Sequence, residues 1–386
     1  MQQFIPRPRL HSAIRRGLSE APVVALLGAR QIGKTTLAEQ IVSAWDGPSI
    51  IFDLEARGER AALSATPERV LRSTDGLVVI DEIQRMPELF EVLRPICDAR
   101  DRNAVFLVLG SASLDLIEAV SETLAGRVLF VDVGGLSIAE AGPENQDRLW
   151  LRGGFPRAYL AASSGAWSRW MESFTRTFLE RDIPGLRSRV APAAVGRFWR
   201  MLAHYHGQTW NAAELGRSMD VSVTAVRNYR DLLSGSFMIR QLPPWFENLG
   251  KRLVKSPKVF IRDSGILHSL LGIEEMTELA VNPRYGASWE GFALEQTLLE
   301  HGEREAYFYG TQRGAELDLL LLRRGRRWGF EFKCTEAPRT TKSMHVVIRD
   351  LNLERLWVVY PGDVEYPLTG TITALPLKRI GEISLG

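Results

Sequence analysis

The fold of the first part of this chain is decided by residues 26–36, which read LLGARQIGKTT. The residues that fill the spacing GxxxxGK(S/T) are Gly28, Gly33, Lys34 and Thr35. The apolar run 21–27 predicts a buried strand before the loop, and residues 36–45 predict a helix after it. In that setting, backbone N–H groups and a helix N-terminus converge on an anion. The stretch therefore predicts a phosphate-binding loop.

Each position of this loop has an expected role toward a nucleotide. We expect Lys34 to contact the β and γ phosphates of ATP, and the hydroxyl of Thr35 to coordinate Mg²⁺. The residues expected to line the nucleotide are Gly28, Ala29, Arg30, Gln31, Ile32, Gly33, Lys34, Thr35 and Thr36. An ordinary glycine-rich turn is the alternative, and the complete match between a strand and a helix disfavours it.

Two further apolar runs end in polar residues. Residues 77–82 predict a strand that ends in Asp81 and Glu82. We expect Asp81 to lie near the magnesium and Glu82 to act as the general base for an attacking water, whereas the alternative is a strand with a solvated acidic end. The run 105–109 is followed by Gly-Ser, and the hydroxyl of Ser111 would contact the γ-phosphate. Small polar residues also simply end strands.

Length and composition indicate a chain of several domains. At 386 residues, two to four domains are expected. The net charge of +2 gives no bulk electrostatic argument for nucleic acid. The sequence has neither the ~20-residue apolar run of a membrane span nor the apolar core of a secretory signal. We therefore expect a cytoplasmic protein with no membrane partner. Cys97 and Cys334 predict neither a disulfide framework nor a zinc site.

The pattern of strands and helices divides the chain into successive regions. These regions are 1–135, 136–190, 191–285 and 286–386. The first alternates apolar strands with helical stretches, which predicts an α/β domain built on a parallel sheet. The second predicts a helical lid with breaks at 153–156 and 182–185. The third and fourth predict a winged-helix domain and a second α/β domain.

The winged-helix prediction rests on the order of helices and strands. Residues 211–216 and 223–233 predict helices joined by a turn, and 236–242 and 258–261 predict the strands of a wing. The polar side chains that the second helix would offer to DNA are Thr224, Arg227, Asn228 and Arg230. The alternative is a domain of this kind used only for packing.

Basic residues gather in two stretches of the chain. They are Arg323, Arg324, Arg326 and Arg327 in one stretch, and Lys251, Arg252, Lys255 and Lys258 in the other. A basic stretch is either a contact for nucleic acid or an ordinary solvated surface, and the sequence leaves both interpretations open.

The last region predicts a β-hairpin with one charged face. Residues 314–322 and 328–334 read as strands on either side of an Arg-Gly turn. In a hairpin centred between the arginine and the glycine of this turn, the charged pairs are Asp318 with Glu331 and Glu316 with Lys333. Because side chains alternate along a strand, all of these charged groups share one face.

The charged face predicts a metal site. Asp318 and Glu331, directly opposed, destabilise the hairpin by up to ~1 kcal/mol, and a divalent cation such as Mg²⁺ or Mn²⁺ would remove that repulsion. Glu290, on a preceding helix, would be a further ligand. We expect Lys333 to orient a metal-bound water or to stabilise charge on a phosphate oxygen. The alternative is a hairpin with a surface ion pair between Glu316 and Lys333.

With these residues in place, the chain resembles the AAA-type ATPases that carry a C-terminal PD-(D/E)xK nuclease-like domain. The segments that carry the resemblance are 28–36, 79–84, 109–111, 124–127 and 180–184. It implies a P-loop AAA-type domain with a helical lid, and a restriction-endonuclease-like α/β domain at the end. It also implies that Arg127 completes the ATP site of a neighbouring subunit in a ring, such as a hexamer. Arg157 looks like the lid arginine that senses the nucleotide.

The C-terminal pattern also resembles Holliday-junction resolvases. Their helix glutamate, aspartate and ExK positions are filled here by Glu290, Asp318, Glu331 and Lys333. We therefore expect an oligomeric, ATP-hydrolysing protein that acts on branched or junction DNA and has a metal-dependent nuclease-like domain. One alternative is a nucleotide-gated DNA-binding regulator, or an antitoxin-like switch, that breaks no bond in DNA. Another is an assembly ATPase whose C-terminal domain contacts protein.

Overall fold

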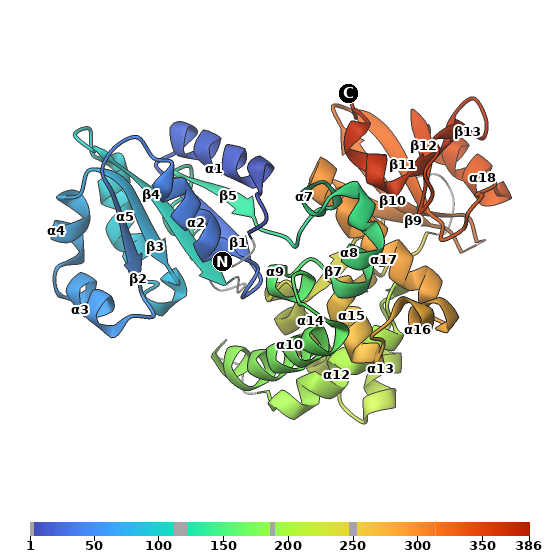
Figure 1. Cartoon of the computed structure of the whole chain (residues 1–386), viewed down its shortest axis with the longest axis horizontal. Helices are drawn as coiled ribbons and strands as arrows, with labels where there is room; N and C mark the ends of the chain where they lie inside the picture. The colour runs from blue at the N-terminus through green and yellow to red at the C-terminus, as the bar shows by residue number, and fades with distance from the viewer. Residues whose placement is uncertain (1–3, 112–119, 121, 186–189, 247–252, 313) are drawn as a thin grey trace. The chain divides into compact units, whose positions relative to one another are not determined.

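The computed structural model describes residues 4–111, 120, 122–185, 190–246, 253–312 and 314–386 (Figure 1). The described chain divides into two compact units. The first comprises the chain up to residue 135 together with 235–237, and the second comprises 136–234 and 238–386. No helix among the described residues is long and apolar enough to span a membrane.

A parallel β-sheet forms the centre of the first unit. Its strands are β1 (Val23–Gly28), β2 (Ser49–Asp53), β3 (Gly76–Asp81), β4 (Ala104–Ser111) and β5 (Val128–Asp132). They lie in the order β2-β3-β4-β1-β5, and each neighbouring pair is parallel. The strands expected from the apolar runs are thus confirmed. Because the strands are parallel, the segments that follow them meet at one edge of the sheet.

Helices cover both faces of this sheet (Figure 1). They are α1 (Pro8–Glu20), α2 (Lys34–Ser43), α3 (Arg57–Ala65), α4 (Pro67–Arg72), the short 3₁₀ helix η1 (Ile83–Arg85) and α5 (Leu89–Asp98). Helix α1 packs on the face that carries Val24, where Gly17 permits close approach. The opposite face carries Val23 and Val78 and joins Leu63 and Leu93 in one buried cluster. Every residue of β1 is buried, as expected for a strand whose sheet is covered on both faces.

The second unit begins with a helical segment. Its elements are α7 (Ile138–Ala141), η2 (Pro143–Asn145), α8 (Gln146–Arg152), α9 (Pro156–Tyr159), α10 (Ser164–Thr177), the π-helical turn η3 (Phe178–Asp182) and α11 (Ile183–Gly185). The break expected at 182–185 is wrong, because α10 continues through η3 into α11. A π turn changes the hydrogen-bond spacing just before Pro184, whose ring has no N–H to donate.

Helices and a small antiparallel sheet follow. The elements are α12 (Pro192–His204), β6 (Gln208–Thr209), α13 (Ala212–Met219), α14 (Val223–Gly235), β7 (Ile239–Leu242), β8 (Lys258–Ile261), α15 (Ser264–Leu271) and α16 (Met276–Val281). The strands pair in the order β6-β8-β7. Asn211 caps α13, and Asp220 ends it in the left-handed conformation. The two expected helices and the expected strand pair are confirmed.

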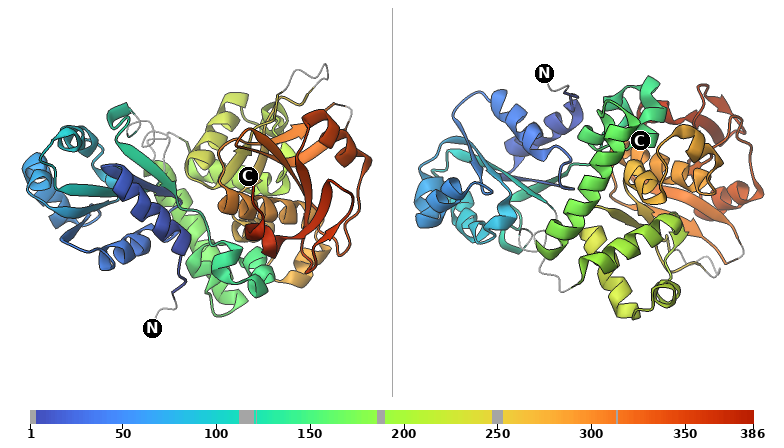
Figure 2. Two further views of the ribbon diagram at one scale, coloured as in Figure 1. Left: turned by 90° about the horizontal axis from the view of Figure 1, so that it is seen from above. Right: turned by 60° about the horizontal axis from the view of Figure 1, so that its bottom comes forward.

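A mixed sheet forms the C-terminal part of the unit (Figures 1 and 2). The elements are α17 (Tyr285–His301), β9 (Ala306–Gly310), β10 (Glu316–Arg323), β11 (Arg326–Phe332), α18 (Lys342–Leu351), β12 (Arg355–Tyr360), β13 (Tyr366–Pro367), β14 (Ile372–Pro376) and η4 (Leu377–Glu382). The strand order is β13-β14-β12-β11-β10-β9. Helix α18 packs on the face that carries Leu356 and Val358. Helix α17 packs on the other face, where His301 stacks on Phe330.

Candidate functional site

The phosphate-binding loop joins the end of β1 to the start of α2. Gly33 is the N-cap of α2 and has φ of 100°, a left-handed conformation that favours glycine. Gly28 has no room for a side chain, because a Cβ atom there would lie 2.4 Å from the carbonyl oxygen of Val133. Both glycines of the motif are therefore required by the backbone, which agrees with the expected phosphate cradle.

Lys34 lies inside this loop. Its Nζ atom donates hydrogen bonds to the carbonyl oxygens of Gly28 and Ala29, both at 2.9 Å, and only 7% of the residue is exposed. The ammonium is thereby held at the place where the loop would receive phosphate groups. An incoming phosphate can take over these hydrogen bonds without a large movement of the side chain.

Thr35 and Asp81 bring oxygen atoms together next to Lys34. The hydroxyl of Thr35 donates to Oδ2 of Asp81 at 2.6 Å. Burial raises the pKa of Asp81, and the Thr35 hydrogen bond partly offsets that effect. A hydroxyl and a carboxylate are ligands that Mg²⁺ accepts, so the residues present fit a nucleotide-bound magnesium ion.

Glu82 follows Asp81 in a strained backbone conformation. Its φ of 57° and ψ of 43° are left-handed, which is uncommon outside glycine. Gln84 donates a hydrogen bond from Nε2 to the Glu82 carboxylate. The glutamate thus stands next to Asp81 in an orientation fixed by Gln84. The sequence predicted no role for Gln84, which belongs to the segment 79–84.

Other loop residues make contacts within the first unit. Arg30 pairs with Glu55 at 3.3 Å, and Glu55 also pairs with Arg85 at 3.4 Å. Ile32 is buried in the core, so its contact with a nucleotide would come from the backbone. The last residue of β4, Ser111, pairs in register with Gly28, which places its backbone beside the loop. Its side chain lies outside what the structure describes.

The two expected arginines, Arg127 and Arg157, belong to different units. Arg127 precedes β5, and its carbonyl accepts from Val23 at the start of β1, the end of the sheet opposite the loop. Its guanidinium forms a bidentate ion pair with Asp98 at 2.6 and 2.8 Å. Arg127 therefore does not reach the phosphate loop of its own chain. Arg157 lies on α9 in the second unit with its side chain exposed.

The β10–β11 hairpin has the expected register. Its pairs run from Leu319 opposite Phe330 to Arg323 opposite Arg326, and the same register places Asp318 opposite Glu331. The turn residues 324 and 325 both have positive φ, as a tight hairpin turn requires. On the other side of β10, the pairing with β9 is irregular between residues 317 and 320. Such a bulge re-aims side chains, here next to Asp318.

This hairpin and α17 assemble an acidic cluster whose centre is buried. We use "acidic cluster" for the carboxylates of Glu290, Glu316, Asp318 and Glu331. Asp318 and Glu331 are 6% and 5% exposed. Lys333 lies 2.8 Å from Oε2 of Glu331 and 3.6 Å from Oδ2 of Asp318. The backbone N–H of Phe332 also donates to Oδ2 of Asp318, at 3.0 Å.

A second lysine enters the acidic cluster from β8. The Nζ atom of Lys258 lies 2.6 Å from Oε1 of Glu316, 3.0 Å from Oε1 of Glu290 and 3.6 Å from Oδ1 of Asp318. Lys258 is only 5% exposed, so its assignment to a basic surface stretch is wrong. Lys251 and Arg252 of that stretch lie outside the described residues.

The carboxyl groups and lysines of the cluster shift one another's pKa values. Burial, together with Asp318, raises the pKa of Glu290 to about 7 and that of Glu331 to about 8, although the lysines act in the opposite direction. Burial alone would lower the pKa of Lys258, but the surrounding carboxylates more than offset it and raise it. Both lysines are therefore charged at neutral pH, with carboxylates as their partners.

The cluster does not have the donor arrangement of a metal site. Within the described residues, no group of at least three His, Cys, Asp or Glu side chains is placed to hold one metal ion. The structure brings Glu290, Asp318, Glu331 and Lys333 together, as expected, but the ammonium of Lys258 lies among the carboxylate oxygens. The metal expected at Glu290, Asp318 and Glu331 stays a prediction.

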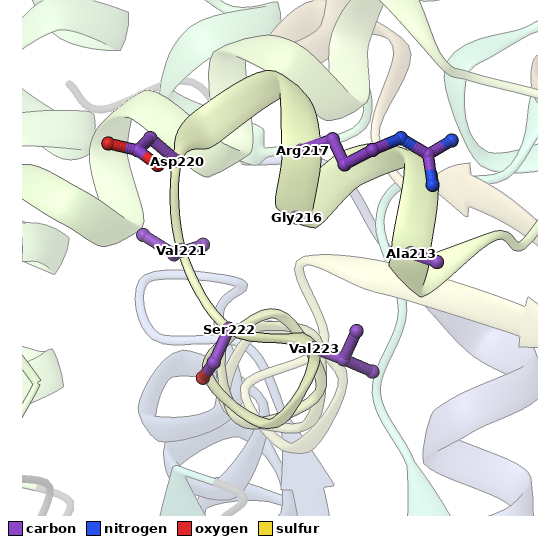
Figure 3. Close-up of a pocket in the computed structure, with 7 residues that line it drawn as sticks. All are labelled: Ala213, Gly216, Arg217, Asp220, Val221, Ser222 and Val223. Carbon is purple, nitrogen blue, oxygen red and sulfur yellow. The ribbon is translucent and has the colours of Figure 1, made fainter.

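The turn between α13 and α14 borders a hollow of about 600 Å³ (Figure 3). The residues that line it are Ala213, Gly216, Arg217, Asp220, Val221, Ser222 and Val223. Of the side chains expected to face DNA, Thr224, Arg227 and Asn228 are exposed on α14. Arg230 instead pairs with Asp231 at 2.8 Å and stacks over the ring of Trp210. Its role is therefore packing.

Comparison with known proteins assigns the chain to a family. Two curated proteins described as uncharacterized, from Mycobacterium tuberculosis and Mycobacterium bovis, are each 46% identical to it over 377 residues. The matched region covers 98% of this chain and 85% of each relative. This chain belongs to their family. Residues 20–142 match the family described as AAA domain, and 143–277 and 285–380 match domains of unknown function (DUF8612 and DUF4143).

Solved structures also show likeness to the chain. A Walker-type ATPase of Pyrococcus abyssi is 16% identical, with a TM-score of 0.49 over 69% of this chain and 96% of the other. The RuvB Holliday junction branch migration motor of Thermotoga maritima is 18% identical, with a TM-score of 0.29 over 62% and 91%. Likenesses of this size say nothing about function.

The AAA domain match and the loop geometry point to the same activity. The matched residues contain β1, the phosphate-binding loop, Asp81 and Glu82. The chain therefore carries an AAA-type P-loop ATPase domain, and ATP hydrolysis is the activity that this domain supports.

Proposed function

We propose that this family member hydrolyses ATP in order to process DNA, with branched or junction DNA as its substrate class. The observation that carries the DNA part is the order α12-β6-α13-α14-β7-β8 with strand pairing β6-β8-β7. This order supports the assignment of a winged-helix domain, in which the second helix of the helix-turn-helix would read the major groove.

The proposed DNA-reading face is the exposed side of α14. Thr224, Arg227 and Asn228 present two hydrogen-bonding groups and one cation to solvent, while Val226 and Tyr229 on the same helix are buried. Arg217 lines the hollow beside this helix. An arginine on such a face contacts a phosphate or a guanine edge.

The proposed ATP reaction uses the residues around the phosphate-binding loop. Lys34 transfers its hydrogen bonds from loop carbonyls to phosphate oxygens, and Thr35 and Asp81 are the residues that would hold Mg²⁺. The ion supplies positive charge against the phosphate oxygens when it is bound. Glu82 orients a water molecule and accepts its proton, and Ser111 contacts the γ-phosphate.

We propose that the ATP site is completed by a neighbouring subunit. Arg127 lies at the end of the sheet opposite the loop of its own chain, which suits a role toward another copy. A ring, such as a hexamer, places each Arg127 at the next subunit's loop, after release of the ion pair with Asp98. Arg157 is the proposed lid arginine that senses the nucleotide.

The last domain, residues 286–386, is proposed to be a nuclease-like domain of the restriction-endonuclease type. The mixed sheet, α17 and the four positions Glu290, Asp318, Glu331 and Lys333 support this assignment. Cleavage with Mg²⁺ or Mn²⁺ at these residues stays a prediction. A second candidate is a nucleotide-gated DNA-binding regulator that breaks no bond in DNA, and the position of Lys258 within the acidic cluster favours it.

The test uses the full chain with labelled linear, forked and four-way DNA, with Mg²⁺ or Mn²⁺, and with or without ATP. Binding that prefers four-way or forked DNA, and that weakens in Arg227→Ala, is the expected result. Each lost phosphate contact lowers the salt slope of binding by about 1. Arg69→Ala, at an arginine of α4 in the first unit, is the control.

Cleavage separates the two candidates. Products that disappear in Glu331→Ala would establish a nuclease. Binding or ATP-dependent strand rearrangement without products, abolished in Lys34→Ala, would establish a motor or a regulator. Absence of DNA binding under every condition would contradict the proposal and turn attention to a protein partner.

A further inference from the structure

In the second unit, the side chain of a lysine in the small antiparallel sheet reaches into the acidic cluster. Lys258 is the first residue of β8, which pairs with β6 and β7. Its side chain reaches Glu290 on α17 and Glu316 on β10, which belong to the C-terminal part of the unit. A buried ammonium needs carboxylate partners, because burial without them is strongly unfavourable.

The segment that leads into β8 is held in place by hydrogen bonds to β9, in the C-terminal part of the unit. The backbone of Phe308 in β9 accepts from Trp245 and donates to Pro243, at 2.7 and 2.9 Å. Val254 donates to Gly310 of the same strand at 2.9 Å. The described parts of the segment between β7 and β8 are thus bonded to the edge of β9. This anchoring fixes the position at which β8 begins. The backbone therefore places Lys258, its first residue, next to the acidic cluster.

The ammonium uses oxygens that a divalent cation would need. It lies within 3.6 Å of carboxylate oxygens from Glu290, Glu316 and Asp318. Mg²⁺ requires oxygen ligands at about 2.0–2.1 Å in nearly octahedral geometry. An ammonium and a divalent ion at the same oxygens repel each other. The ring of Phe308, whose centroid lies 5.7 Å from Nζ, further stabilises the ammonium of Lys258.

We propose that Lys258 is the resident cation of the acidic cluster and takes the place that a divalent metal would occupy beside Glu290, Glu316 and Asp318. The residues as they stand therefore do not fit a metal ion. Lys258 and Lys333 hold the carboxyl groups of the cluster together without any metal. This inference goes beyond the proposed function, because it holds whether or not the protein binds DNA.

The test measures Mn²⁺ binding by electron paramagnetic resonance on nucleotide-free, full-length protein. All proteins carry Thr35→Ala, which removes a ligand of the ATP-associated ion. The Lys258→Met variant is compared with Lys255→Met, which replaces an exposed lysine three residues earlier. We expect Lys258→Met to bind Mn²⁺ at least tenfold more tightly than the parent, and Lys255→Met to match the parent.

Further variants assign the new site. Adding Glu290→Gln to Lys258→Met should abolish the gained Mn²⁺ binding. The same Mn²⁺ should raise the melting temperature of Lys258→Met and leave that of the parent unchanged. A Lys258→Met protein that folds but gains no Mn²⁺ affinity would overturn the proposal.

The parent protein alone provides a test if Lys258→Met does not fold. Its melting temperature should be the same in EDTA and in Mn²⁺, and Glu290→Gln should not alter its Mn²⁺ binding. Saturable Mn²⁺ binding by the parent that is lost in Glu290→Gln would show that the metal, and not Lys258, occupies the cluster. DNA cleavage plays no part in these readouts, so failure here and failure of the proposed function are distinguishable.

Discussion

Replacement of Glu82 by glutamine is the sharpest perturbation of the ATP site. Glutamine keeps the size of the side chain and its hydrogen-bonding capacity, but it cannot accept a proton from water. The left-handed backbone adds no new strain, because Glu82 already adopts φ of 57° and glutamine has the same unbranched carbon chain. Loss of general base catalysis lowers the turnover of ATP by about 10²–10⁴-fold, which corresponds to about 3–5 kcal/mol in the activation barrier.

Steady-state ATP turnover and binding of a fluorescent ATP analogue are measured side by side. Binding should remain within about threefold of the parent, because Lys34, Thr35 and Asp81 are unchanged. Glu91→Gln, at an exposed glutamate of α5, is the matched control and should turn over ATP at the parent rate. Unchanged turnover in Glu82→Gln, or a loss fully explained by weaker ATP binding, would refute the role of Glu82 as general base.

Further predictions concern the loop, a buried histidine and the contact between subunits. Gly28→Ala should cost about 1–3 kcal/mol in the free energy of unfolding and weaken ATP binding, because its Cβ would overlap a neighbouring carbonyl, whereas Gly58→Ala, in open space, should do neither. Urea unfolding and ATP titration check both variants, and equal stability of the two would contradict the expected clash. Burial lowers the pKa of His268 to about 4, so the stability that it contributes is present at neutral pH and is lost as pH falls from about 6.5 toward 4. Between pH 8 and pH 5, His268 accounts for about 2 kcal/mol of the decrease in the free energy of unfolding. Urea unfolding at the two pH values should therefore show a smaller decrease for His268→Asn than for the parent. An equal decrease would contradict the prediction. Arg127→Ala should lose ATP turnover and regain part of it when mixed with Glu82→Gln subunits, because a hybrid site then combines both intact groups; no gain on mixing would exclude a shared site.

The phosphate-binding loop could be predicted because its information is local. Consecutive residues supply the strand, the turn and the helix, and the two glycines are required by a close contact and by a positive φ. The helix begins at Lys34, two residues earlier than expected, since Gly33 itself serves as the N-cap. Hairpin register was also predictable, because the Arg-Gly turn between β10 and β11 sets the pairing of the strands on either side of it.

The environment of Lys258 could not be predicted in this way. Its nearest carboxylate partner in sequence is Glu290, 32 residues later, and no local pattern reports such a contact. The neighbouring basic residues favoured a surface assignment. One signal was available, since Val259, Phe260 and Ile261 form an uninterrupted apolar run and a lysine at the start of a fully buried strand needs a partner. Arg230 was misassigned for a related reason, because its stacking on Trp210 depends on tertiary packing.

A cation that belongs to a side chain responds differently to its surroundings than a bound metal ion does. The ammonium of Lys258 is delivered with the polypeptide, so its presence beside Glu290 and Glu316 does not vary with the concentration of free metal. A chelator cannot extract it, and a competing metal cannot replace it without displacing a strand residue. It also bridges β8 to α17 and β10, so unfolding of either part exposes charge in the other. The two parts of the second unit should therefore melt together in one transition.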